Sequence, residues 1–230
     1  MNEHAVHTER LTAACLLSAI GGFLDIYTYL FRGEVFANAV TGNMVLFGLH
    51  IAQGEWNHCS RYVIAILAYC AGVFASELIA LKVPDSRKIS WHQLVIVLEF
   101  LCLLPACFIP YGELDYAVNA VISFVCALQV QTFRRVHGLP FSSTMCTGNL
   151  RSGSEAVFRS FATGSREELG KALHYFGVIV FFIGGAVGGA LLLHGFGHFA
   201  FLLVPAGLAA VFFLIAPGAG FSFRRFLSRR

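Results

Sequence analysis

The chain has 230 residues, of which 57% are hydrophobic and 13% are charged, and its formal net charge is +3. Soluble domains are about 45–50% apolar and about 25% charged, so this composition indicates an integral membrane protein surrounded by the lipid bilayer. The basic residues are scattered over connections and chain ends without an aromatic-interleaved groove, which argues against nucleic acid as a partner.

The first apolar segment covers residues 11–31 and follows a short tail, residues 1–10. A cleaved signal peptide has a basic front and a shorter apolar run, so we expect a retained transmembrane helix. Asp25 lies inside this span. Carboxyl groups inside membrane helices usually face a cavity or a partner. Asp25 therefore either carries a proton or cation, or forms a structural hydrogen bond to the backbone of the next segment.

The next apolar segment, residues 36–52, contains the triplet Thr41-Gly42-Asn43 and is preceded by Asn38. Three further spans of about 20 apolar residues are predicted at residues 61–81, 91–109 and 114–133. Glu99 lies near the middle of the second of these three. Gln129, Gln131 and Arg134 lie near the end of the third, where an arginine either marks the cytoplasmic side or guards an inner mouth against cations.

The triplet returns as Thr147-Gly148-Asn149 in the segment of residues 141–161, after Thr144. This segment also carries Arg151, Glu155 and Arg159, and each charge at a membrane centre costs about 2.5–3.5 kcal/mol on insertion scales. We therefore expect it to enter and leave the membrane on one side. The last two spans are predicted at residues 171–193 and 199–216, and glycines at 184, 185, 188 and 189 predict close helix packing in the first of them.

The basic residues favour six spans over eight. With both triplet segments re-entrant and the N-terminus inside, every Lys and Arg except Arg32 and Arg61 is cytoplasmic, which is 14 of 16. Positive residues concentrate on the cytoplasmic side of membrane proteins. We therefore expect one membrane domain over residues 1–230, with two cytoplasmic tails, residues 1–10 and 217–230.

The two triplets divide the chain into similar halves, residues 11–110 and 114–216. Each half reads span, triplet segment, span, span, and Gly72 and Ser76 correspond to Gly184 and Gly188. Because three spans per half is an odd number, the halves face opposite ways, as in many transporters. The predicted fold is an all-α membrane protein with six transmembrane helices in two inverted three-helix repeats, each with a re-entrant or broken helix at its triplet.

Two stretches also resemble a known family. The first is GGFLDIYTYLFRGEVFANAVTGNMVLFGLHIAQGEW, with Asp25, Phe36 and Asn38 before the triplet; the second is ALQVQTFRRVHGLPFSSTMCTGNLRSG. Both resemble motifs of the YoaK-like family of bacterial membrane proteins, a domain of unknown function, although Gln131 stands where the family pattern has Asn. The resemblance implies a six-helix protein of the bacterial inner membrane and implies no particular activity.

We expect a pathway for a small solute between the two halves. A helix that starts at each triplet would direct its amides and positive dipole end toward the membrane centre, which favours an anion or a polar neutral solute. Alternatively, each triplet caps a tightly packed short helix. The residues predicted to line a pathway are Asp25, Asn38, Thr41, Gly42, Asn43, Glu99, Gln129, Gln131, Thr144, Thr147, Gly148 and Asn149, with Arg134 at the inner mouth.

Other functions remain open at this level. The chain is either a transporter or channel, a non-transporting scaffold that binds a partner, or, less favoured, an intramembrane enzyme that uses Asp25 and Glu99. It has no GxSxG, HExxH, Walker-type or GxGxxG signature. The seven cysteines form no CxxC pair, and His194 with His198 are too few for a closed metal site. We therefore expect no metal and no cofactor, and homo-oligomers are compatible with the sequence.

Overall fold

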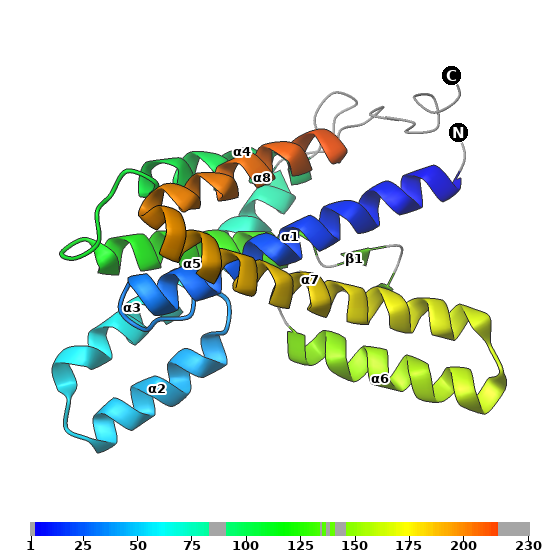
Figure 1. Ribbon diagram of the computed structural model, residues 1–230, viewed down its shortest axis with the longest axis horizontal. Helices are drawn as coiled ribbons and strands as arrows, with labels where there is room; N and C mark the ends of the chain where they lie inside the picture. Colours follow the sequence, from blue (N-terminus) through cyan, green and yellow to red (C-terminus); the bar gives the residue numbers. More distant parts are fainter. Residues whose placement is uncertain (1–2, 83–90, 134, 137–138, 141–145, 216–230) are drawn as a thin grey trace.

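The computed structural model describes residues 3–82, 91–133, 135–136, 139–140 and 146–215. Nearly all of this part of the chain is helical, with eight α-helices, one 3-10 helix and two two-residue strands (Figure 1). In chain order the elements are α1 Glu3–Phe31, α2 Val40–Ala52, α3 Trp56–Lys82, α4 Trp91–Ala106, α5 Asp115–Thr132, β1 Arg135–Val136, β2 Leu139–Pro140, α6 Cys146–Thr163, α7 Arg166–Phe196, η1 Gly197–Leu202 and α8 Leu203–Leu214.

Within the described residues, three helical segments are long and apolar enough to cross a membrane. They are Leu11–Phe31, Trp56–Lys82 and the combined stretch Arg166–Leu214, while Val40–Ala52 and Trp91–Ala106 are apolar but shorter. Each predicted span therefore forms a helix, but α4 has only 16 residues. At 1.5 Å per residue it is about 24 Å long, less than the roughly 30 Å of a bilayer core.

The last predicted span is not one continuous α-helix. The chain turns at Gly197, where φ is +59°, within the connection predicted between residues 193 and 199. It then forms η1, which includes the first residues of the predicted span, and only afterwards α8. A positive φ is easy for glycine and costly for other residues, so this glycine ends the long helix α7.

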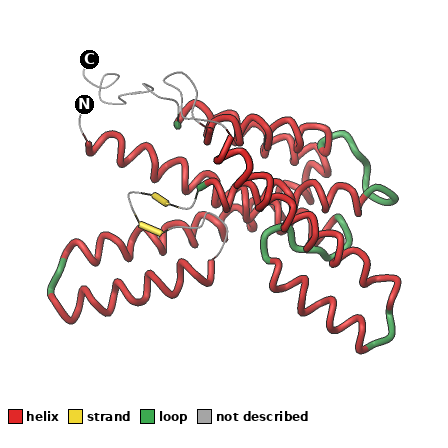
Figure 2. The backbone as a smooth tube through the Cα atoms, turned by 180° about the vertical axis from the view of Figure 1, so that it is seen from behind, coloured by secondary structure: helices red, strands yellow, loops and turns green. Residues whose placement is uncertain are grey.

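Helices of the first half of the chain pack mainly against helices of the second half. α1 packs against α7 and α8, α5 packs against α3 and α4, and α4 packs against α8. Each short helix lies against the long helix that follows it, α2 on α3 and α6 on α7. Figure 1 shows these as two hairpins on opposite sides of the molecule. Figure 2 shows the small β1–β2 ribbon, which follows α5 and precedes α6 in the chain and contacts α1.

Close helix contacts are made at two glycines. A Cβ atom on Gly185 of α7 would collide with the Ala19 carbonyl oxygen of α1, and one on Gly72 of α3 would collide with the Phe124 carbonyl oxygen of α5. Gly184 and Gly188 face open space instead. Close packing through small residues is thus confirmed for one face of α7, and the counterpart of Gly72 by contact is Gly185, one position from the predicted Gly184.

An arginine joins α1 to the α4–α5 connection at one end of the bundle. Arg32 is 1% exposed. Its guanidinium donates to the Ile109 and Pro110 carbonyl oxygens at 2.5 and 2.8 Å and pairs with Asp115 at 2.6 Å. It also donates to the Tyr27 hydroxyl. The sequence places Arg32 in a connection, yet its side chain is buried because these partners satisfy its charge.

Candidate functional site

The first triplet forms the opening turn of α2. Asn43 is buried and bonds twice to the backbone of Phe36: its Oδ1 accepts from the Phe36 amide at 2.9 Å, and its Nδ2 donates to the Phe36 carbonyl at 2.7 Å. A Cβ atom on Gly42 would lie 2.9 Å from the Phe36 ring. The triplet therefore fixes the loop before α2, with Thr41 exposed.

Asp25 ties this same loop to α1. Its carboxylate accepts from the Asn38 amide at 2.7 Å and also interacts with the amides of Ala37 and Ala39. The Asn38 side chain donates in turn to the Gly21 carbonyl at 3.1 Å. Of the two roles that the sequence left open for Asp25, this geometry provides the structural hydrogen bond to the backbone.

The second triplet forms the opening turn of α6. Asn149 is buried, whereas Thr147 and Gly148 are exposed, and a Cβ atom on Gly148 would meet open space. Cys146, the first residue of α6, lies within electrostatic range of Asp25. The starts of α2 and α6 are therefore both close to the same carboxylate on α1.

Glu99 is the most deeply buried acid of the described chain. It is 0% exposed, and neither carboxyl oxygen has a hydrogen-bond partner among the described residues. Cys126 of α5 lies within electrostatic range of both Glu99 and Asp25 and also approaches Asn38.

One face of α5 adds polar groups that the sequence analysis missed. Asn119 donates to the Arg32 carbonyl at 2.7 Å. Its Oδ1 and the hydroxyl of Ser123 are buried and have no partner among the described residues. With Cys126, these residues are spaced four and three positions apart, so they share one helix face. That spacing of small polar residues inside an apolar span was the available signal.

The remaining predicted site residues lie elsewhere. Gln129 is buried and donates to the Leu17 carbonyl at 3.3 Å. Gln131 bonds to Glu77 of α3. Thr144 and Arg134 lie outside the described residues.

A family model described as "Protein of unknown function (DUF1275)" matches residues 13–215. The chain belongs to this family. It is also similar to the UPF0700 transmembrane protein YoaK of Bacillus subtilis (strain 168), with 27% identity over 151 residues, which is 64% of this chain and 67% of that protein. No solved structure matches the chain.

Family membership confirms the resemblance noted in the sequence. Together with the apolar helices it identifies a membrane protein with transmembrane helices. The family description carries no activity, so chemistry must be argued from the side chains. Their common property is a set of buried polar atoms that have no partner among the described residues, on Glu99, Asn119, Ser123 and Asn38. Such atoms are costly in an apolar interior and are usually satisfied by water or a ligand.

Proposed function

We propose that the protein is a transporter or channel for a small polar or anionic solute in the bacterial inner membrane, with its pathway between two inverted halves. One observation carries the proposal. Two short helices begin at matching triplets. Asp25 binds the loop that leads into the first, Cys146 at the start of the second lies within electrostatic range of that carboxylate, and several buried polar atoms have no partner in the described chain.

The packing of the helices supports the inverted repeat. Exchanging α1 with α5, α2 with α6, α3 with α7 and α4 with α8 turns the α1–α7 contact into α5–α3 and the α2–α3 contact into α6–α7. It also turns α4–α5 into α8–α1 and leaves α4–α8 unchanged. The glycine contacts follow the same exchange, since Gly72 meets α5 and Gly185 meets α1. Such a pairing is expected when one three-span unit occurs twice.

In this proposal α1, α3 and α4 form the three spans of one half, and α5, α7 and α8 form those of the other. Of the shorter helices, α5 packs against the long helix α3 and α8 against the long helix α1, while α4 packs mainly against α5 and α8. A span shorter than the bilayer core is accommodated by local thinning of the bilayer. Arg32 and Arg61 then lie on the outer side, where Arg32 is buried and Arg61 donates to the Gly33 carbonyl at 2.7 Å. Neither side chain needs to lie free in the membrane.

The chemistry of the proposed solute follows from the groups that face it. Helix N-terminal amides and their dipole favour a negative or hydrogen-bond-accepting group. The Asn119 Oδ1 and Asn38 Oδ1 atoms accept, while the Ser123 hydroxyl both donates and accepts. This mixture fits a small solute with donors and acceptors, such as a polar neutral molecule or a small oxyanion, better than a bare cation.

Solute flux tests the proposal. Purified protein in liposomes should speed the shrinkage or swelling caused by gradients of urea, glycerol, formate and nitrate, measured by light scattering against empty liposomes. Ser123→Ala should reduce the flux, whereas Ser76→Ala should not, because the Ser76 hydroxyl bonds to Thr132 between α3 and α5 at 3.1 Å. Flux equal to that of empty liposomes for the whole panel, from folded protein, would support the scaffold reading instead.

A further inference from the structure

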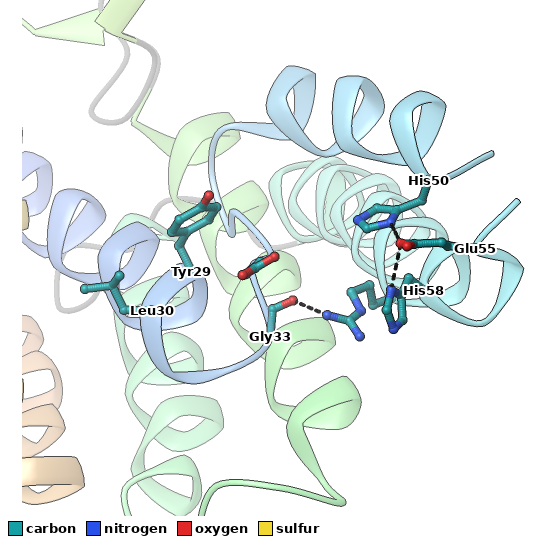
Figure 3. Close-up of a pocket in the computed structure, with 8 residues that line it drawn as sticks. Tyr29, Leu30, Gly33, His50, Glu55 and His58 are labelled. Atoms are coloured by element: carbon teal, nitrogen blue, oxygen red, sulfur yellow. Dashed lines mark hydrogen bonds and ion pairs between the residues drawn. The ribbon is translucent and has the colours of Figure 1, made fainter. Parts of the chain in front are cut away.

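A second group of chemically active side chains lies at the turn between α2 and α3, apart from the triplets. His50 is in the last turn of α2, Glu55 is in the connection, and His58 is in the first turn of α3. Figure 3 shows the three side chains directed at one another. They border a pocket of about 470 Å³ that is also lined by Tyr29, Leu30, Gly33, Glu34 and Arg61.

The three side chains converge on one oxygen atom. Glu55 Oε2 lies 2.7 Å from Nδ1 of His50 and 3.3 Å from Nδ1 of His58. One ligand atom from each residue lies within 4.8 Å of the other two. Two imidazole nitrogens and a carboxylate at this separation can contact a single ion, and all three belong to the ligand types that zinc prefers.

A buried tyrosine holds the first histidine in place. Nε2 of His50 lies 3.1 Å from the hydroxyl of Tyr62, a residue that is 0% exposed, and the two rings are stacked. Ligating histidines usually use their second ring nitrogen in this way, which fixes the ring and leaves the other nitrogen for the ion. Tyr62 lies on α3, so α3 positions the His50 ring, which α2 supplies.

The backbone of the turn is also fixed. The Glu55 amide donates to the His50 carbonyl at 2.9 Å, and the His58 amide donates to the Glu55 carbonyl at 3.0 Å. Gly54 has a φ of +75°, which a glycine adopts readily. The three residues are therefore spaced by hydrogen bonds within the turn, so little reordering is needed to bind an ion.

Charge around the pocket favours a cation. Glu34 and Glu55 bring two carboxylates, against one guanidinium from Arg61. The side chains of Glu55 and His58 are each 48% exposed, so an ion can enter from solution.

We propose that His50, Glu55 and His58 form a binding site for a divalent transition metal ion of the zinc class, which ties the end of α2 to the start of α3. Two histidines and one carboxylate leave a further coordination position for water. Imidazole ligands select zinc and its neighbours over magnesium and calcium, which prefer all-oxygen sites. No metal is predicted from the sequence, because the cysteines form no CxxC pair and His194 with His198 are too few for a closed site. The inference does not depend on solute transport.

Metal binding to the full chain in detergent, with any affinity tag removed, tests the proposal. After chelator treatment, the wild type should bind one Zn²⁺ in competition with a chromogenic chelator and should melt at a higher temperature with Zn²⁺ than without, since a ligand of the native state stabilises it. Magnesium should give no such shift. Cobalt should bind with a visible spectrum typical of nitrogen and oxygen ligands.

The variants separate this site from other binding. His58→Gln and Glu55→Gln lie at half-exposed positions and should keep the metal-free melting temperature while losing Zn²⁺ affinity by at least about ten-fold. His198→Gln and Cys59→Ser are the matched controls and should bind as the wild type does. Equal Zn²⁺ affinity in His58→Gln and the wild type, or loss of binding in Cys59→Ser alone, would overturn the assignment.

Discussion

Two carboxyl groups inside the helical bundle differ in what their oxygens contact. Asp25 accepts from the backbone amide of Asn38, whereas both oxygens of Glu99 are without partners among the described residues. A hydrogen-bonded buried group stabilises the fold, and an unpaired one costs free energy unless a ligand or water serves it. The two acids should therefore respond in opposite ways to neutral substitution.

Asp25 should be a stabilising residue. In Asp25→Asn the side-chain oxygen can still accept from the Asn38 amide, so we expect a small loss of stability. Asp25→Leu leaves that buried amide unsatisfied, which costs about 1–3 kcal/mol. Thermal unfolding in detergent should rank wild type, Asp25→Asn and Asp25→Leu in that order. Equal melting temperatures for the wild type and Asp25→Leu would remove the structural role.

Glu99 should act on transport more than on stability. Glu99→Gln keeps the shape and removes an acid from a fully buried position, so the melting temperature should stay the same or rise. Solute flux in liposomes should fall. A protein that melts lower and transports normally would show that Glu99 stabilises the fold through a contact and takes no part in the pathway.

Arg32 should be among the most sensitive positions for stability. Its substitution by Gln would leave the Asp115 carboxylate without its partner and several carbonyls without donors. Removing one partner of a buried ion pair costs about 3–5 kcal/mol of stability. For a chain of this length, each kcal/mol lowers the melting temperature by about 2–4 °C. Asp115→Asn should cost less stability, because the Asp115 side chain is 20% exposed. A shift for Arg32→Gln no larger than that for Asp115→Asn would contradict this account.

At the scale of helices, apolar length was enough to predict where the elements lie. Each predicted span and each triplet segment contains a helix, and each triplet lies in the first turn of a helix. The triplet residues do not cap α2, because its N-cap is Ala39 and no side chain caps it. Length and hydropathy predicted the break between residues 193 and 199, which contains Gly197, but they did not reveal that the next residues form the 3-10 helix η1 before α8 begins. They also did not reveal that Arg32 is buried, since its partners come from residues about 80 positions away.

The candidate site could be predicted only in part, for a similar reason. The triplets and Asp25 were visible as a repeated motif and as an acid in an apolar run. Ser123, Asn119 and the set of His50, Glu55 and His58 depend on which faces of the helices meet. A single sequence gives the spacing of such residues but does not say which of their side chains face another helix.

The glycine contacts predict a difference between neighbouring positions on one helix. Gly185→Ala would place a Cβ atom against the Ala19 carbonyl, and forcing apart packed backbones typically costs about 1–3 kcal/mol. Gly184→Ala meets no neighbour and should be neutral or slightly stabilising, because alanine favours helix. Thermal unfolding of the two variants measures this, and equal melting temperatures would contradict the observed α1–α7 packing.

At the scale of the whole molecule, the six-span proposal predicts which connections share a side of the membrane. Gln53 lies in the connection between α2 and α3, and Glu113 lies in the connection between α4 and α5. Ala162 lies near the end of α6. Six spans with re-entrant triplet segments put Gln53→Cys and Glu113→Cys outside and Ala162→Cys inside. Eight spans put all three on one side. Labelling of intact cells with an impermeant thiol reagent, on a background without the seven native cysteines, distinguishes the two.

The central claim is that solute passes the polar face of α5, between the two halves. Cysteines at three consecutive positions test it most directly, because Ser123 belongs to the polar face, Ile122 is packed in the core and Val121 is 37% exposed on the outside of the bundle. In proteoliposomes, a water-soluble thiol reagent should modify Ser123→Cys and block flux, while Ile122→Cys and Val121→Cys react far more slowly. If Ser123→Cys reacts no faster than Ile122→Cys, that face is dry, and the account of a pathway between the halves is wrong.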